Sequence, residues 1–331
     1  RGSIMRKFSW KKFFLILISL LVLIPLTLLG ALWYQLNSLN SLELNTENLN
    51  VSTNNKISDT INIALFGTDS RKSDYNSSAR SDAIMIATLD TKEKKVKLTS
   101  IMRDSLVDIP GKGYDKITHA YAYGGPELAI STLNTNFDLN ITDYITVDFF
   151  SLAKIVDFFG GFEVTLNSGE VRAMNKAINE INRIENLPHG TDYVELYDEP
   201  ITLNGRQTVS YSRIRKTGGG DFERTERQRR VLSYCIEQIQ NLSVSDAISL
   251  ISKVLPFVNT SLTPTEIINL SAQVLSLGKF DIEQLRLPID GAFREGRYNS
   301  MWVINPDIER NTQALHNFIN NIKDEDHTDE Y

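Results

Sequence analysis

The sequence predicts an α/β fold, an α–β–α sandwich around a mixed, partly antiparallel sheet, with an N-terminal transmembrane helix in front of it. Strand-like and helical patterns mix along the chain without strict alternation, which favours a mixed sheet covered by helices. A tight turn joins two of the strand-like runs, as in an antiparallel pair. An uncharged stretch of about 20 residues near the start is long enough to cross a bilayer.

The first 58 residues divide into a basic tail, an apolar run and a polar segment. Residues 1–12 are basic and are expected in the cytoplasm; the four residues before Met5 have the appearance of a cloning remnant. Residues 13–34 carry no charge, and no small-residue cleavage site follows them. This predicts an uncleaved transmembrane signal anchor rather than a signal peptide or a buried core helix. Residues 35–58 are rich in Asn, Ser and Thr and predict a polar stalk.

Residues 59–325 are expected to form one extracellular domain, and residues 326–331 an acidic, frayed tail. Short apolar runs that end at turn residues predict strands at 61–66, 83–89, 96–101, 282–287 and 301–304. Apolar residues at helical spacing predict helices at 126–133, 149–159, 171–186, 223–241, 246–258 and 264–277.

The composition excludes several classes of function. A net charge of −6 argues against general nucleic-acid binding, which needs a broad basic surface. Because Cys235 is the single cysteine, no intrachain disulfide can form, and its apolar helical surroundings indicate a core position. With four histidines and no CxxC motif, a zinc site is not expected.

A cluster of arginines lies just before and within the helix predicted at 223–241, although the chain is net acidic. Its members are Arg206, Arg213, Arg215, Arg224, Arg227, Arg229 and Arg230. The planar guanidinium fits phosphate oxygens two at a time. At 100° per residue, Arg224 and Gln228 fall on the apolar stripe of the helix, whereas Arg229 and Arg230 fall well off it. Since an unpaired buried charge is costly, either acidic partners lie inside or this face opens into an anion-binding cavity.

Carboxylates flank the segment between the first two predicted strands. Asp69 follows the first strand and Asp82 opens the second, so the two can meet at one edge of the sheet. Such a pair beside a phosphate site suits Mg²⁺ or Mn²⁺, although Asp is also a common turn residue. Arg103 and Asp104 follow the strand that ends at residue 101, at an edge where open α/β sheets bind ligands. An ordinary surface ion pair is the alternative.

The segment 149–159 is crowded with phenylalanine and aliphatic side chains. Such a segment usually packs in a core, and a pocket for a lipid tail is the alternative reading. The helical pattern alone does not separate the two.

Six stretches, taken in order, resemble the LytR-CpsA-Psr family of Gram-positive and related bacteria. They are INIALFGTDSR (61–71), RSDAIMIATLD (80–90), LTSIMRDSLVDIPG (98–111), KITHAYAYGGPELAISTLN (116–134), DYITVDFFSLAKIVDFFGGFEVTL (143–166) and LNGRQTVSYSRIRKTGGGDFERTERQRRVL (203–232). Two residues depart from the expected pattern: His119 stands where a small or polar residue is expected, and Met102 where proline is expected.

The resemblance implies an αβα sandwich with a long apolar pocket, and a metal-dependent phosphotransferase at the outer face of the cytoplasmic membrane. Such an enzyme moves an anionic glycopolymer (teichoic acid, capsule or another secondary wall polymer) from a polyprenyl-pyrophosphate carrier to a peptidoglycan hydroxyl. The product is a phosphodiester. A hydrolase that uses water as the acceptor, and a non-catalytic receptor for polyprenyl phosphates, are the alternatives.

The resemblance also assigns roles to individual residues. Mg²⁺ or Mn²⁺ would be held by Asp69 and Asp82. The pyrophosphate would be bound by Arg103, Arg213, Arg215, Asp221, Arg224, Arg227 and Gln228. Catalytic roles would fall to Arg71, Arg103 and Asp104. The general base is not identified, because the pKa of an arginine such as Arg103 is too high for that role.

Overall fold

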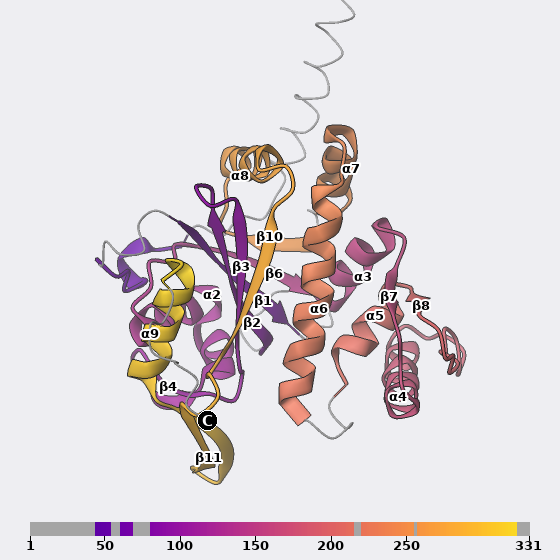
Figure 1. The fold of residues 1–331 in the computed structure, drawn as a ribbon. Helices are drawn as coiled ribbons and strands as arrows, with labels where there is room; N and C mark the ends of the chain where they lie inside the picture. Colours follow the sequence, from indigo (N-terminus) through magenta and orange to yellow (C-terminus); the bar gives the residue numbers. More distant parts are fainter. Residues whose placement is uncertain (1–43, 54–59, 69–79, 215–219, 255–256, 323–331) are drawn as a thin grey trace, which may run out of the picture. The chain divides into compact units, whose positions relative to one another are not determined.

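A six-stranded mixed sheet is the centre of the fold (Figure 1). The computed structural model describes residues 44–53, 60–68, 80–214, 220–254 and 257–322. The sheet has the order β10–β3–β2–β1–β6–β9. Its strands are β1 (Ile61–Thr68), β2 (Ser81–Asp90), β3 (Lys95–Ile101), β6 (Asp143–Asp148), β9 (Val258–Thr260) and β10 (Asp281–Leu287). Strands β1, β2 and β3 pair antiparallel, whereas β6 joins β1 and β10 joins β3 in parallel. The predicted α/β class with a mixed, partly antiparallel sheet is confirmed.

The turn between β2 and β3 forms where the sequence predicts it. Asp90 pairs with Lys95 across the hairpin, and the Asp90 carboxylate accepts hydrogen bonds from the backbone N–H groups of Lys92 and Glu93. Lys94 adopts a φ of 53°, the left-handed conformation that closes such a turn. The hairpin therefore brings the start of β2 and the end of β3 to the same edge of the sheet.

Helices cover both faces of the sheet. Alternate strand residues such as Ala64 and Phe66 point into one core, where they meet α2 (Ile117–Phe137) and α9 (Ile308–Ile319). On the opposite face Leu89 packs with residues that follow α8 (Pro264–Ser276) and with α6 (Gly220–Gln240). These two apolar layers fix α2 and α9 on one face of the sheet and the C-terminal half of α6, through Ile236, on the other.

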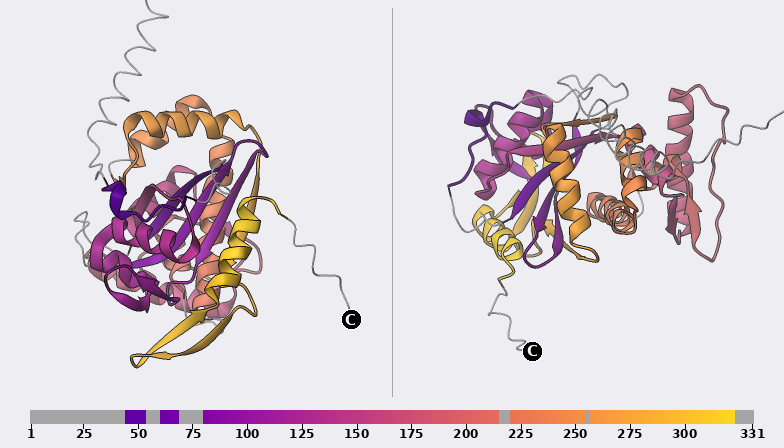
Figure 2. Two further views of the ribbon diagram at one scale, coloured as in Figure 1. Left: turned by 90° about the vertical axis from the view of Figure 1, so that its left-hand side faces the viewer. Right: turned by 90° about the horizontal axis from the view of Figure 1, so that it is seen from above.

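A second group of helices lies beside the sheet, as Figures 1 and 2 show, and a separate apolar core joins them. Its elements are α3 (Phe149–Phe158), α4 (Ser168–Ile184), α5 (Gly205–Ser212), α6, β7 (Phe162–Val164) and β8 (Ile201–Leu203). Helix α7 (Val244–Val254) contacts α3. Helix α5 lies so close to α3 that a Cβ atom on Gly205 would stand 2.1 Å from the carbonyl oxygen of Ala153. Only glycine fits at this contact.

Three further elements complete the described part of the chain. Strands β4 (Leu106–Ile109) and β5 (Gly113–Lys116) form one hairpin, and β11 (Phe293–Tyr298) and β12 (Met301–Pro306) form another. A short 3₁₀ turn, Thr46–Asn48, lies near the start.

The predicted strands correspond to β1, β2, β3, β10 and β12 of the structure. The helix predicted at 126–133 is the second part of α2, which begins earlier and is kinked at Gly124 and Gly125. Strands β4 to β9 and β11 and helices α5 and α9 were not predicted. Among the described residues no helix is both long and apolar enough to cross a membrane. The anchor predicted at 13–34 and the tail at 326–331 lie outside the described residues.

Candidate functional site

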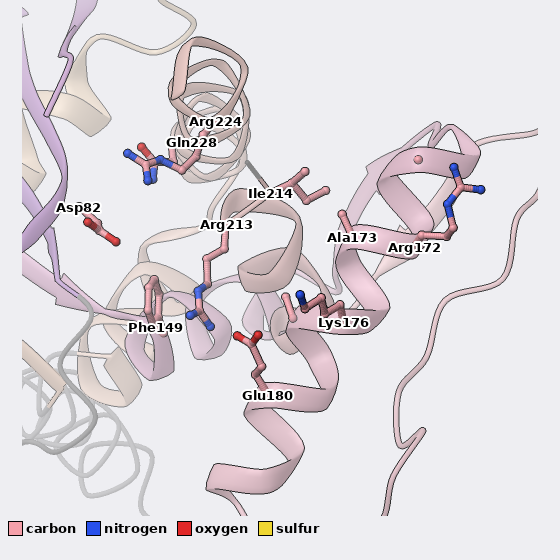
Figure 3. Close-up of a pocket in the computed structure, with 12 residues that line it drawn as sticks. Asp82, Phe149, Arg172, Ala173, Lys176, Glu180, Arg213, Ile214, Arg224 and Gln228 are labelled. Atoms are coloured by element: carbon pink, nitrogen blue, oxygen red, sulfur yellow. The ribbon is translucent and has the colours of Figure 1, made fainter. Parts of the chain in front are cut away.

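A cavity of about 520 Å³ opens between the edge of the sheet and the helical core (Figure 3). The sheet contributes Asp82, the second residue of β2. Phe149 begins α3, Arg213 and Ile214 follow α5, and Arg224 and Gln228 lie on α6. The other six lining residues belong to α4. Four of the residues predicted to bind metal or pyrophosphate therefore lie around one cavity.

On the inward face of α6, Arg224 has an acidic partner and also faces a cavity; that the cavity binds an anion stays a prediction. Arg224 is 2% exposed, and its Nη2 lies 3.2 Å from Oδ2 of Asp221, which supplies the acidic partner. Arg224 and Gln228 also line the cavity, one helical turn apart. Arg224 is therefore both paired inside the protein and presented to the cavity.

Arg213 is placed in the cavity by the end of α5. Asn204 caps the start of α5 in a capping box with Gln207, and the helix ends at Ser212, so that Arg213 is the C-cap. The Arg213 guanidinium carbon lies 4.7 Å from the centre of the Phe149 ring. This contact holds the cation above an aromatic face at the cavity wall. Phe149 thus lines the cavity, while Val156 of the same helix is fully buried in the helical core.

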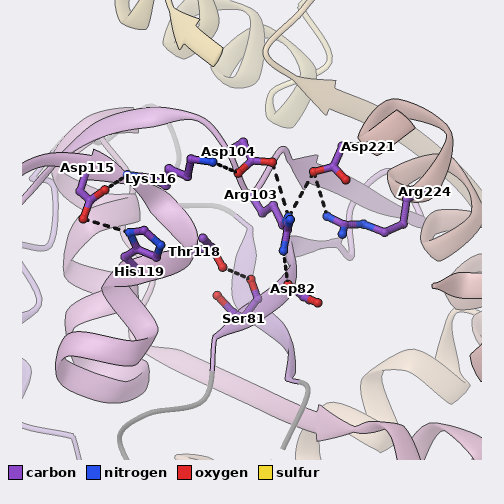
Figure 4. A network of polar contacts seen from close by, with 10 residues as sticks. All are labelled: Ser81, Asp82, Arg103, Asp104, Asp115, Lys116, Thr118, His119, Asp221 and Arg224. Atoms are coloured by element: carbon purple, nitrogen blue, oxygen red, sulfur yellow. Dashed lines mark hydrogen bonds and ion pairs between the residues drawn. The ribbon is translucent and has the colours of Figure 1, made fainter. Parts of the chain in front are cut away.

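Arg103 is the centre of a network of carboxylates (Figure 4). Its Nη1 lies 2.5 Å from Oδ1 of Asp82, and its Nε lies 3.1 Å from Oδ2 of Asp221. Asp104 is the third carboxylate, at 3.5 Å from Nε, and its other oxygen accepts from Nζ of Lys116 at 2.7 Å. Arg103 thereby connects the start of β2 to the start of α6. Its predicted contact with pyrophosphate stays a prediction.

The surroundings lower the pKa of the Asp221 carboxyl group and raise that of Asp104. Burial acts to raise the pKa of Asp221, but a hydrogen bond from Asp104 and the charges of Arg224 and Arg103 lower it to about 2. Burial and the hydrogen bond to Asp221 raise the pKa of Asp104. Burial by itself would lower the pKa of Arg103, yet the carboxylates around it raise that pKa. Of the two carboxyls, Asp104 is the one that holds a proton more readily.

The remaining arginines of α6 point elsewhere. Arg227, predicted to bind pyrophosphate, is buried and bonds Glu170 of α4 at 3.1 Å and Glu223 at 2.9 Å. Arg229 pairs with Glu226 of the same helix, and exposed Arg230 donates to the hydroxyl of Tyr211. Arg227 therefore ties α6 to α4 and is absent from the described cavity lining.

Part of the predicted site cannot be placed. Asp69, Arg71 and Arg215 lie outside the residues that the structure describes. Within the described ranges, no group of three or more His, Cys, Asp or Glu residues is arranged to hold a metal ion. Asp82 alone remains to test the fit. Its carboxylate on the cavity wall is the kind of ligand that Mg²⁺ takes together with phosphate oxygens and waters, whereas the guanidinium of Arg224 cannot bind a metal ion.

Sequence reasoning missed the contribution of α4. This helix lines the cavity with Gly169, Arg172, Ala173, Lys176, Ala177 and Glu180. The charged members recur every four residues, which places them on one face, while Val171, Met174 and Ile178 are buried on the other. That periodicity was readable in the sequence. The same pattern is typical of a helix face exposed to solvent, so the sequence alone did not indicate that this face of α4 lines a cavity.

The chain is similar to several known proteins in sequence and in fold. The TagU polyisoprenyl-teichoic acid–peptidoglycan teichoic acid transferase of Enterococcus faecalis is 30% identical over 274 residues, 82% of either chain. The transferase of the same description named TagT, from Bacillus subtilis, is 35% identical over 187 residues, 56% of this chain and 54% of TagT. A solved structure described as TagT bound to LIIa-WTA superimposes with a TM-score of 0.61 at 26% identity, covering 81% of this chain and 92% of that one. Residues 34–317 match the LytR_cpsA_psr family, and the chain belongs to this LytR-CpsA-Psr family.

Proposed function

We propose that this protein transfers an anionic glycopolymer from a polyprenyl-pyrophosphate carrier to a hydroxyl of peptidoglycan. The observation that carries the proposal is the cavity in which Arg213, Arg224 and Gln228 lie together with Asp82. Cations that are fixed in place and partly shielded from water stabilise the charge that develops on a pyrophosphate in transfer. The similarity to TagU and TagT, which are named as teichoic acid transferases, supports the same chemistry.

The proposed reaction exchanges one phosphorus–oxygen bond for another. The peptidoglycan hydroxyl oxygen attacks the phosphorus that carries the polymer, and the bond to the bridging oxygen of the pyrophosphate breaks. Polyprenyl phosphate leaves with that oxygen, the hydroxyl proton passes to a base, and a phosphodiester remains. Arg213 and Arg224 would hold the non-bridging oxygens, and Gln228 would donate a hydrogen bond beside them. Arg103 would hold Asp82 and Asp221 in position, and its contact with the pyrophosphate and the catalytic role of Asp104 are part of the proposal.

The function is tested with purified protein, a polyprenyl-pyrophosphate-linked glycopolymer and peptidoglycan fragments. The proposal predicts a phosphodiester-linked product and the release of polyprenyl monophosphate in equal amounts. Release of monophosphate without a linked product would identify a hydrolase. Tight binding of the donor without any turnover would identify a receptor. Either result would overturn the transfer proposal.

We further propose that Asp82, together with Asp69, holds Mg²⁺ or Mn²⁺ when pyrophosphate is bound. Such an ion would neutralise charge on the pyrophosphate oxygens. We expect Asp82→Ala to lose most transfer activity, and chelation to do the same to the wild-type protein. Because Asp82 is also a partner of Arg103, a thermal melt must accompany the assay. Full activity in both the variant and the chelated protein would exclude the metal role.

We propose that the domain lies outside the cell, attached to the membrane by residues 13–34, with the basic tail inside. The single native cysteine favours a clean test, since burial raises the pKa of the Cys235 thiol to about 12 and leaves it unreactive at neutral pH. Thr53 is exposed, so we expect Thr53→Cys to react with a membrane-impermeant maleimide on intact cells. Labelling that appears only after lysis would contradict this orientation.

A further inference from the structure

The hairpin of β11 and β12 is joined to the carboxylate network at its base. The backbone N–H of Ile304 in β12 donates to the carbonyl oxygen of Asp104 at 2.9 Å. On β11 the ring of Phe293 packs against Phe222, with the ring centres 5.8 Å apart. Phe222 directly follows Asp221, one of the carboxylates of that network. The base of the hairpin therefore lies between the segment after β3 and the start of α6, beside the candidate site.

One face of this hairpin continues from the buried base to an exposed tip. Residues opposite each other in an antiparallel pair share a face, as do residues two apart along a strand. Ile304 is fully buried, whereas Trp302, two residues earlier on the same face, is 40% exposed. Arg297 is exposed and stands opposite Trp302 in the register. Figure 2 shows the hairpin projecting from the rest of the domain. The face that packs beside the site therefore ends in a tryptophan and an arginine that reach solvent.

The tip of the hairpin is held in one shape. Asn299 and Ser300 form its two-residue turn with φ values of 46° and 66°, the left-handed conformation that closes a tight hairpin. Tyr298 and Met301 pair on either side of this turn. The exposed tryptophan and arginine are thus presented in a fixed relation, which lowers the entropy cost of binding a ligand.

The exposed pair matches a ligand that has an apolar face and a negative charge. Arg294 and Arg297 form no ion pair with any other residue in the described ranges, and Glu295 is the only acid of the hairpin. A guanidinium binds a carboxylate through two hydrogen bonds, and the flat ring of Trp302 can stack on the C–H face of a sugar ring. Peptidoglycan supplies both groups, as its sugar rings and as the carboxylates of its peptide stems.

The hairpin and the entry of the chain into the domain lie at opposite ends of the sheet. Ser52 donates its backbone N–H to the carbonyl oxygen of Leu139 at 2.9 Å, just before β6 begins beside the start of β1. Asp104 instead follows β3, whose end pairs with the start of β2, where β1 ends. Since β1 spans eight residues, the two ends are about 25 Å apart. A partner of the hairpin therefore approaches from the side opposite to the entering chain, which favours the wall polymer over a membrane surface.

We infer that Trp302 and Arg297 form a docking surface for the peptidoglycan acceptor, separate from the cavity. Trp302 stacks on a sugar ring of the strand, and Arg297 binds a carboxylate of a peptide stem. The inference rests on the proposed function, and it adds the surface that brings the acceptor to the site. Because neither residue is among the described residues that line the cavity, the surface acts on acceptor binding and not on the donor.

The experiment measures binding to the full-length protein held in nanodiscs of zwitterionic lipid. The probes are uncross-linked peptidoglycan strands, the same strands with their stem carboxylates converted to amides, and a polyprenyl pyrophosphate. The test variants are Trp302→Ala, Trp302→Phe and Arg297→Ala. Tyr197→Ala and Arg183→Ala are the matched controls, because both residues are exposed and lie outside the hairpin.

We expect Trp302→Ala to weaken the binding of both kinds of strand about tenfold, and Trp302→Phe, which keeps an aromatic ring, to retain most of it. Arg297→Ala should weaken the unmodified strands about fivefold and the amidated strands within about twofold. The polyprenyl pyrophosphate should bind every variant within about twofold of the wild type, which also shows that the variants are folded. In a transfer assay the KM for the acceptor should rise by the same factors, with kcat and the KM for the donor unchanged.

Three outcomes would overturn the docking surface. Unchanged strand binding in both Trp302→Ala and Arg297→Ala would leave the hairpin without this role. Equal losses in the hairpin variants and the matched controls would show that strands adhere to the protein without a defined site. If anionic nanodisc lipid, and not the strands, protects residues 293–306 from hydrogen exchange, the hairpin contacts the membrane instead.

The proposed function is judged separately, by product formation. A wild-type protein that transfers the polymer keeps that function even if the hairpin variants bind strands normally. A wild-type protein that binds strands through the hairpin but forms no product keeps the docking surface and loses the proposed function.

Discussion

Replacing Arg224 with alanine is expected to lower the transfer rate about a hundredfold or more. A charge-assisted contact that strengthens in the transition state contributes about 3 kcal/mol, which corresponds to such a factor. Arg224 lines the cavity and is 2% exposed, so water cannot take its place as it would at the surface. The variant should also melt at a lower temperature, because Asp221 loses one of its two arginine partners.

The matched controls lie on the same helix. Arg229→Ala and Arg230→Ala each remove a cation from α6 outside the cavity, and both should keep nearly normal turnover. The measurement is the initial transfer rate with one pyrophosphate-linked donor, with a thermal melt for each variant. Normal turnover in Arg224→Ala together with a lowered melt would show that this arginine serves only the fold, and the clamp would then be misplaced.

Replacing Arg103 with alanine is expected to damage both the fold and the activity. The side chain is 19% exposed and lies within ion-pair distance of three carboxylates. Removing it leaves Asp82 and Asp221 without a shared counter-charge, and breaking a buried pair in this way costs about 3 kcal/mol or more. For a domain of this size that corresponds to a fall in melting temperature on the order of 10 °C. Activity should fall as well, since Asp82 loses its orientation.

Lys95→Ala is a suitable control for this experiment. Lys95 pairs with Glu283 at 2.6 Å across β3 and β10, but both side chains are partly exposed, and pairs of this kind contribute little to stability. A second variant, Arg103→Ala with Asp82→Asn, neutralises a carboxylate that has lost its counter-charge, and it should recover part of the stability. If Arg103→Ala melts like the wild type, the carboxylate network does not depend on this arginine.

The part of the site that could be predicted is the part that local geometry determines. Arg224 and Gln228 were assigned to an inward face because both belong to one helix, whose period sets their direction. The hairpin at Asp90–Lys95 followed from the turn residues between two apolar runs. Both were predicted without knowing what lies opposite them.

The contacts between distant segments could not be predicted in the same way. Arg103 meets Asp221, which is 118 residues later, and Arg227 meets Glu170, 57 residues earlier. Spacing along the chain carries no signal for such pairs, and Arg227 was grouped with the phosphate ligands through the family resemblance. Strand β6 was missed for a related reason. It pairs with β1 in parallel and joins residues about 80 positions apart, so the sequence contains no turn between two adjacent strands that would predict it.

The close approach of α5 to α3 has a consequence for the interpretation of mutants. Gly205 sits at one end of a helix only eight residues long, and Arg213 sits at the other. Any larger residue at position 205 would push α5 away from α3. Because α5 is short and regular, the displacement would also move the guanidinium of Arg213 at its other end. A screen for inactive variants would therefore return substitutions that never touch the ligand. A substitution at position 205 would therefore lower activity by displacing Arg213 from its place in the cavity.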